Sequence, residues 1–331
     1  MERRRETNYD VSGVHIDLQV CKTLSDEVRQ DLILSGLVPK KEKSMWSPVK
    51  QLTILGYFID TENHFISIPE ERLLKVFKTI NLIEYNLEKI SEVPARLTAS
   101  LVGQLVSMSY VIGNVTNIMT KYLSIDILDK QSWNSAICLS KESLDQIAFW
   151  KRNLRTANLK EFTFDLSCHI IVYSDASNTG YGGYMVENPS DIAHGMWSSN
   201  ASMKSSTWKE LTTVKNILFS INKFLHNKRI KQFTDNQNVV SIINKGSMKR
   251  KLQDIAISML CNFLNNNISI DVEWIPRSKN DQADFISRIV HYDDWGVSDE
   301  IFIHLDSLWG PHEIDWFAND NNHKLPVFYF R

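Results

Sequence analysis

The chain has 331 residues, of which 43% are hydrophobic and 23% charged, and 37 Lys and Arg against 39 Asp and Glu give a formal net charge of −2. This composition is typical of a globular chain of about two domains. It excludes a disordered chain, a collagen and a disulfide scaffold. Because the charges balance, any binding of a polyanion such as nucleic acid must depend on local basic patches. The four cysteines form no C-x-x-C pair, no apolar run approaches the ~18 residues of a membrane span, and the charged start MERRRETNYD is no secretory signal, so we expect an intracellular protein, cytoplasmic or nuclear, without a membrane partner.

The first 150 residues predict a hairpin and a series of helices. Residues 26–37 have the amphipathic pattern of a short helix. Two β-rich runs, 51–60 and 64–69, flank a polar turn and predict a β-hairpin. Pro69 followed by two glutamates predicts a helix start, and helical apolar spacing continues to about Trp150.

The pattern changes near Phe162 to short strands that alternate with helices. We expect three strands in an antiparallel meander, then a long helix, a fourth strand, two helices, a fifth strand and a short last helix. These elements are predicted at 169–173, 181–186, 193–197, 206–226, 230–233, 239–243, 252–263, 268–275 and 281–287. Their order favours an α/β (α+β) fold in which helices flank a mixed five-stranded sheet.

Four acidic residues stand where these elements begin or end. Asp175 ends the first strand and Asp235 ends the fourth, so neighbouring strands would bring both carboxylates to one sheet edge. Glu210, in the first turn of the long helix, and Asp284, in the last helix, can then lie over that edge. Clustered carboxylates repel one another unless a cation lies among them, and oxygen-only ligands suit Mg²⁺ or Mn²⁺. Two such ions roughly 4 Å apart form the clamp used in phosphodiester hydrolysis.

Each acid also has a purely structural interpretation. Asp235 ahead of a helix is typical of an N-cap, and Thr207-x-x-Glu210 has the spacing of a capping box. Asp175 fits a turn residue, and Asp284 fits a solvated helix face. These interpretations stay open for each residue alone, but they do not explain why all four fall where one metal cluster needs them.

The motifs around these acids resemble the ribonuclease H domain of retroelement polyproteins. The resemblance rests on YSDAS at 173–177, GYGG at 180–183, Glu210, TDN at 234–236 and the closing run from Asn280 to Arg288. The tail from Trp309 to Ala318, together with WIPR at 274–277, resembles the tyrosine-recombinase (DIRS-type) retroelements.

This resemblance implies a catalytic site and a substrate. The implied catalytic residues and metal ligands, for two Mg²⁺ ions with Mn²⁺ as a substitute, are Asp175, Glu210, Asp235 and Asp284. The implied reaction is endonucleolytic cleavage of the RNA strand of an RNA–DNA hybrid, leaving a 5′-phosphate and a 3′-hydroxyl. The nucleic-acid contacts that we expect near this site are Ser177, Asn178, Asn236, Gln237 and Arg277.

Two features depart from the family pattern. Many members carry a histidine some ten residues before the last aspartate, whereas this chain has Arg277 in that region. We expect slower catalysis, or a phosphate held by Arg277. The basic protrusion with which some relatives grip a hybrid is also not obvious, and the nearest candidates are Lys245, Lys249, Arg250 and Lys251.

The first half resembles the end of a reverse-transcriptase palm followed by its thumb. Lys43 matches a lysine placed near the incoming triphosphate, residues 55–57 match the hairpin that holds the primer end, and residues 97–105 match a thumb helix. A basic surface turn, a plain hairpin and a core helix are the alternatives. The resemblance divides the chain into a palm remnant, a helical thumb and connection, a ribonuclease H-like domain and a C-terminal extension, at 1–68, 69–160, 165–290 and 291–331.

A polymerase needs paired aspartates to hold its metals, and this chain retains only Tyr9-Asp10. We therefore expect no DNA polymerase activity, but a ribonuclease H on a truncated reverse transcriptase, with an RNA–DNA hybrid and a fuller retroelement polyprotein as candidate partners. The alternative is a decayed element that acts only as a nucleic-acid-binding or scaffold protein. The missing histidine favours this alternative, and the intact acidic quartet opposes it.

Overall fold

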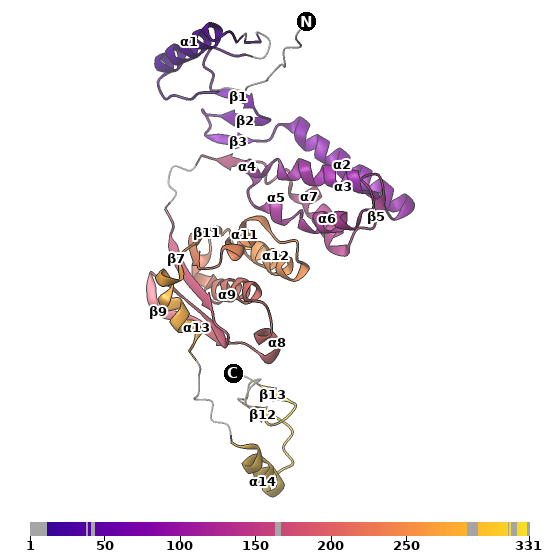
Figure 1. Cartoon of the computed structure of the whole chain (residues 1–331), viewed down its shortest axis with the longest axis vertical. Helices are drawn as coiled ribbons and strands as arrows, with labels where there is room; N and C mark the ends of the chain where they lie inside the picture. Colours follow the sequence, from indigo (N-terminus) through magenta and orange to yellow (C-terminus); the bar gives the residue numbers. More distant parts are fainter. Residues whose placement is uncertain are drawn as a thin grey trace.

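The computed structural model describes residues 12–37, 39–40, 44–162, 167–289, 297–316, 318 and 323–329. Most of these residues belong to two bodies, a helical region (residues 70–153) and a sheet region (residues 170–289), as Figure 1 shows. The predicted role of Lys43 lies outside the described residues.

A small antiparallel sheet precedes the helical region. Its strands, in spatial order, are β1 (Gln51–Ile54), β2 (Tyr57–Asp60), β3 (Phe65–Ser67) and β6 (Lys160–Glu161). The predicted hairpin is confirmed as β2–β3, but the run 51–60 is itself a second hairpin. Leu55 and Gly56 both have positive φ (50° and 77°), which reverses the chain within two residues. Helix α1 (Leu18–Leu34) begins well before residue 26, because Asp17 caps it.

Mostly short helices build the helical region. They are α2 (Glu70–Ile90), α3 (Ala95–Val106), α4 (Ser109–Ile112), α5 (Val115–Ile118), α6 (Lys121–Asp126), the 3₁₀ turn η1 (Ile127–Asp129) and α7 (Lys141–Asn153). In the same region, strands β4 (Val93–Pro94) and β5 (Ala136–Ile137) form an antiparallel pair. Helix α2 begins after Pro69 as predicted, with Glu70 and Glu71 at the positive end of its dipole.

A mixed five-stranded sheet forms the centre of the sheet region and confirms the predicted α/β fold. Its strands, in spatial order, are β11 (Ser269–Trp274), β10 (Arg229–Thr234), β7 (Ile170–Ala176), β8 (Gly180–Met185) and β9 (Asn188–Met196). The meander β7–β8–β9 is antiparallel, and β10 runs parallel to both β7 and β11. The carboxyl ends of β7 and β10 therefore meet at one edge of the sheet.

Helices cover both faces of this sheet. They are α8 (Ser199–Ser202), α9 (Ser206–Ser220), α10 (Asn222–Leu225), α11 (Gln237–Lys245), α12 (Arg250–Asn265), the 3₁₀ turn η2 (Arg277–Lys279) and α13 (Asp281–Ser287). A Cβ added at Gly183 would lie 3.0 Å from Ile217 of α9, whereas one added at Gly182 would lie 2.5 Å from Ile286 of α13. Successive strand residues point to opposite faces, so α9 and α13 lie on opposite sides of the sheet.

The helical region and the sheet region share one apolar core and several polar contacts. Gln253 of α12 is fully buried, donates to Ile118 O of α5 at 2.8 Å and accepts from Ser247 N at 2.8 Å. Arg250 of α12 forms an ion pair with Asp126 of α6 at 3.1 Å. In Figure 1, α11 and α12 accordingly lie next to the short helices of the helical region.

The described part of the C-terminal extension contains α14 (Asp299–Trp309) and the parallel strand pair β12 (Asp315–Trp316) and β13 (Phe328–Tyr329). Helix α14 buries none of its residues. Among the residues described above, no helix combines the length and the apolar character that crossing a lipid bilayer requires. The predicted division of the chain at 1–68, 69–160, 165–290 and 291–331 stays a prediction.

Candidate metal centre

Two of the predicted acids lie at the shared edge of β7 and β10. Asp175 is the second-last residue of β7 and is 4% exposed, and Asp235 directly follows β10. Asp175 pairs with Gly182 inside the sheet, so its interpretation as a turn residue is wrong. The cap of α11 is Asn236, whose side chain accepts from Asn238 N at 3.0 Å, so the N-cap interpretation of Asp235 is also wrong.

Glu210 reaches the same edge from the beginning of α9. Ser205 caps this helix by accepting from the backbone N–H three residues later, so Thr207 and Glu210 form no capping box. Side-chain oxygens of Asp175, Glu210 and Asp235 all lie within 4.8 Å of one another. The structure thus brings together three of the four predicted ligands, and we call these three residues the carboxylate cluster.

Asp175 and Glu210 are buried and Asp235 is half-buried, and Arg277, whose charge acts to lower the pKa of all three, is itself paired with Asp284. No member of the carboxylate cluster forms an ion pair within the part of the chain that the structure describes. Burial, reinforced by repulsion from its neighbours in the cluster, raises the pKa of Glu210 to about 9 and that of Asp175 to about 6. Burial also raises the pKa of Asp235.

One oxygen of the cluster is orphaned. Glu210 Oε2 is buried and has no hydrogen-bond partner among the described residues. A buried carboxylate oxygen without a partner is unfavourable unless the group is protonated or binds a cation. The cluster offers oxygen ligands alone, which is the donor set that Mg²⁺ and Mn²⁺ prefer. The residues present therefore fit a divalent cation.

Asp284, the fourth predicted ligand, is held apart from the cluster by two arginines. Arg288 donates to its carboxylate at 2.8 Å and 2.7 Å, and Arg277 donates at 2.6 Å. Hydrogen bonds and charge from Arg288, then from Arg277, lower the pKa of Asp284 to about 2. Asp284 is thus an ion-paired residue, and its interpretation as a solvated helix position is wrong.

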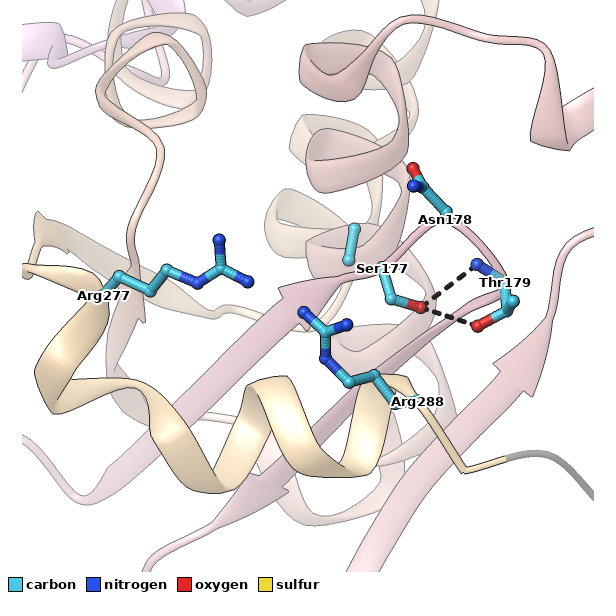
Figure 2. Close-up of a pocket in the computed structure, with 6 residues that line it drawn as sticks. Ser177, Asn178, Thr179, Arg277 and Arg288 are labelled. Atoms are coloured by element: carbon cyan, nitrogen blue, oxygen red, sulfur yellow. Dashed lines mark hydrogen bonds between the residues drawn. The ribbon is translucent and has the colours of Figure 1, made fainter.

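A cavity of about 350 Å³ lies between the loop that follows β7 and the side chains of Arg277 and Arg288 (Figure 2). Its lining consists of Ala176, Ser177, Asn178, Thr179, Arg277 and Arg288. Ser177 is buried, and its hydroxyl accepts from Gly180 N at 2.9 Å and donates to Ser287 O at 2.7 Å. Asn178 and Thr179 are exposed on the same loop. Ser177 therefore shapes the loop, whereas Asn178 remains accessible to a ligand.

The other predicted nucleic-acid contacts lie at the start of α11. The side chain of Asn236 caps this helix, and Gln237, in its first turn, is exposed. They are the first and second residues after Asp235, so their backbone lies next to that member of the cluster. Their contacts with nucleic acid stay predictions.

Three residues that order this site belong to the closing motif of the sequence, but no role in the site was predicted for them. Ser287 Oγ donates to Asp175 Oδ2 at 3.0 Å, and buried Asn280 ties the start of α13 to a β7 carbonyl at 3.0 Å. Arg288 pairs with Asp284. The available indication was spacing, because residues three and four positions after Asp284 share its face of the helix.

Comparisons with known proteins give only weak likenesses. No protein-family model matches the chain, and no curated protein matches it. Among solved structures, the foamy viral protease-reverse transcriptase in complex with RNA/DNA hybrid is 13% identical, with a TM-score of 0.36 over 86% of this chain and 36% of that one. LC11-RNase H1 in complex with RNA/DNA hybrid is 16% identical, with a TM-score of 0.32 over 35% and 92% of the two chains.

A third solved structure, RNase H1 from the halophilic archaeon Halobacterium salinarum, is 22% identical, with a TM-score of 0.27 over 35% and 92% of the two chains. The chain spans 44% and 36% of two foamy viral chains that it resembles. At these identities and scores, the comparisons assign the chain to no family.

Proposed function

We propose that this chain is a metal-dependent nuclease of the ribonuclease H type, which hydrolyses the RNA strand of RNA–DNA hybrids. The observation that carries the proposal is the carboxylate cluster, whose side-chain oxygens lie within 4.8 Å although the three residues come from separate elements. The buried Glu210 Oε2 supports it, because the described residues offer this oxygen no donor and a cation in the cluster would bind it.

In this proposal, Asp175, Glu210 and Asp235 hold two Mg²⁺ ions, with Mn²⁺ as a substitute, and Asp284 serves as the fourth ligand. Bound there, the ions supply an activated water and stabilise the leaving oxygen of the phosphodiester. The chain contributes the positions of the ligands, which the β7–β10 edge fixes for Asp175 and Asp235 and the start of α9 fixes for Glu210. Ser287 orients Asp175 through the hydrogen bond to Oδ2 at 3.0 Å.

The nucleic-acid partner follows from the polar groups around the cluster. Asn178, in the loop after β7, and Gln237, the first residue of α11, are both exposed, and we propose that they contact 2′-hydroxyls in the minor groove of a hybrid. Arg277 and Arg288 add positive charge for the backbone. The sequence motifs support a retroelement reverse transcriptase of the DIRS type as the source of the chain, with a fuller polyprotein as a partner and an intracellular location.

The test is hybrid cleavage with a matched pair of variants. The purified chain is incubated with a labelled RNA–DNA hybrid in Mg²⁺, in Mn²⁺ or in EDTA. We expect RNA fragments with 5′-phosphate ends in either metal, and none in EDTA or with Asp175→Asn. Asp281→Asn is the control, because Asp281 is an exposed acid of α13 outside the cluster and should leave cleavage intact.

The outcomes distinguish an active nuclease from a protein that only binds nucleic acid or acts as a scaffold. Cleavage that survives EDTA or Asp175→Asn would show that another protein or another mechanism is responsible. Tight binding of the hybrid without any cleavage would instead support the decayed scaffold.

A further inference from the structure

The contacts of Asp284 leave its two arginine partners with unused donors. Arg277 donates one N–H to the carboxylate, and Arg288 donates two. Each guanidinium carries five N–H groups, so most of their donors remain available. The arginine side chains are 67% and 53% exposed, against 23% for Asp284. Taken by themselves, these two arginines and one carboxylate carry a net positive charge.

These spare donors face the cavity described above. In Figure 2, the guanidinium groups of Arg277 and Arg288 point toward one another across it, and Asn178 and Thr179 stand on the loop opposite. Planar guanidinium forks match the oxygens of a phosphate, and they bind it better than a single ammonium does. The cavity therefore offers the chemistry of an oxyanion site.

The cavity also adjoins the carboxylate cluster. Arg277 lines it and is close enough to the cluster for its charge to lower the pKa of all three carboxyl groups, and Ala176, also in the lining, directly follows Asp175 in β7. Ser287, one helical turn after Asp284, bonds to Asp175 Oδ2 at 3.0 Å, so α13 already ties the position of Asp284 to the cluster. Ser287 Oγ also lies 2.8 Å from Asp284 O, so the hydroxyl that contacts Asp175 holds the Asp284 backbone nearby, and a carboxylate freed from the arginines would be able to turn toward Asp175.

We propose that this cavity binds a phosphate group, and that the phosphate competes with Asp284 for Arg277 and Arg288, so that its arrival releases Asp284 toward the carboxylate cluster. The ligand is the phosphate of a nucleic acid, either an internucleotide phosphodiester or a terminal phosphate. The exchange is favourable because ion pairs of exposed arginines are weak, and a phosphate replaces the anion that both arginines lose. This inference rests on the proposed function, since it gives the fourth ligand a reason to lie outside the cluster.

The experiment measures Mn²⁺ affinity of the intact chain by electron paramagnetic resonance, with no cleavage involved. Wild type and Asp284→Asn are compared alone, with a hybrid of DNA and 2′-O-methyl RNA, and with uridine 5′-monophosphate. We expect the two proteins to bind Mn²⁺ equally tightly when alone. With a phosphate ligand, wild type should bind Mn²⁺ at least about tenfold more tightly than Asp284→Asn.

A second variant removes the arginines and so tests the same competition from the other side. In Arg277→Gln/Arg288→Gln, Asp284 is free from the start, so Asp284→Asn should weaken Mn²⁺ binding by about tenfold even without a phosphate ligand. Lys279→Gln is the charge control, because Lys279 is an exposed cation of η2 without an ion pair among the described residues.

The result identifies the ligand and can overturn the inference. An effect of the hybrid alone assigns the site to a phosphodiester, and an equal effect of the nucleotide assigns it to a terminal phosphate. If Asp284→Asn has the same effect with and without both ligands, the competition does not exist. If Mn²⁺ binds to no variant, both this inference and the proposed function fail, whereas Mn²⁺ binding without cleavage refutes only the nuclease.

Discussion

The helical region and the sheet region each bury a carboxylate, but they differ in the number of hydrogen-bond donors that they provide for it. Asp126 of α6 is 4% exposed, and its oxygens accept from Ser140 N, Ser140 Oγ and Ser143 Oγ at 2.5–2.7 Å and from Arg250 at 3.1 Å. Glu210 of α9 is 8% exposed, yet its Oε2 has no partner in the described chain. A buried acid with a full set of donors is part of the framework, whereas one without them marks a place for a ligand.

The largest effect that this comparison predicts is at Asp126. Asp126→Ala removes the acceptor that organises the start of α7 and leaves Arg250 without its closest partner. We expect the free energy of unfolding to fall by about 3–5 kcal/mol, as measured by urea denaturation, because three buried or half-buried donors of Ser140 and Ser143 lose a charged acceptor. Glu142→Ala is the control, because Glu142 lies 3.9 Å from Arg250 and is half exposed, and should cost under about 1 kcal/mol. Equal losses in the two variants would contradict the framework role of Asp126.

The next prediction compares the effect on stability of a glycine-to-alanine substitution in each of the two regions. In Gly182→Ala the new Cβ would lie 2.5 Å from both Ile286 Cγ2 and Ser287 N of α13, so the helix must move and stability should fall by about 1–3 kcal/mol. In Gly103→Ala, on α3, nothing lies within 4 Å, and the better helix former should raise stability by about 0.5–1 kcal/mol. Thermal unfolding of both variants gives the signs, and a neutral Gly182→Ala would show that α13 packs more loosely on β8 than described.

The smallest of the three effects is a change in the pH dependence of stability, which tests whether Glu210 lacks hydrogen-bond donors. The pKa of Glu210, about 9 when folded against 4.5 as its ordinary value, means that the folded chain holds a proton that the unfolded chain releases. Stability in EDTA should therefore decline as pH rises from about 4.5 to about 9. Glu210→Gln should lack the share of this decline that Glu210 contributes, whereas Asp175, with a pKa of about 6, still contributes at the lower end of the range. We expect the variant to gain about 1–2 kcal/mol over wild type near the upper end of this range and nothing near its lower end.

Urea denaturation across this pH range checks the prediction, with Glu88→Gln, an exposed acid of α2, as the control that should show no such gain. A gain of Glu210→Gln that is already present at about pH 4 would rule out an ionisation effect. Adding Mn²⁺ should reverse the order, since only wild type then gains the stabilisation that ligand binding confers.

The sequence predicted the sheet and three positions of the site, because these depend on local patterns. Alternating strands, a Pro-led helix start and acids at strand ends are all visible within a few residues, and α13 has the predicted bounds of 281–287. The pairing of Asp284 with Arg277 was not visible, since it needs η2 to bring a residue seven positions away onto the helix. The sequence also could not show which buried acid would have hydrogen-bond donors around it. One donor to Asp126 is Arg250, which lies more than a hundred residues later in the chain.

The amide of Gln253 has a practical consequence. It is fully buried and bonded at both ends, to Ile118 O and to Ser247 N, and neither partner lies in the stretch that joins the two regions. Two halves of the chain, produced separately with the break between Phe162 and Ser167, would each expose part of one apolar surface and would each leave hydrogen-bonding groups unmet. Such fragments should associate with each other and restore the native contacts. Their association could serve as a split-protein reporter, which needs no substrate for its readout.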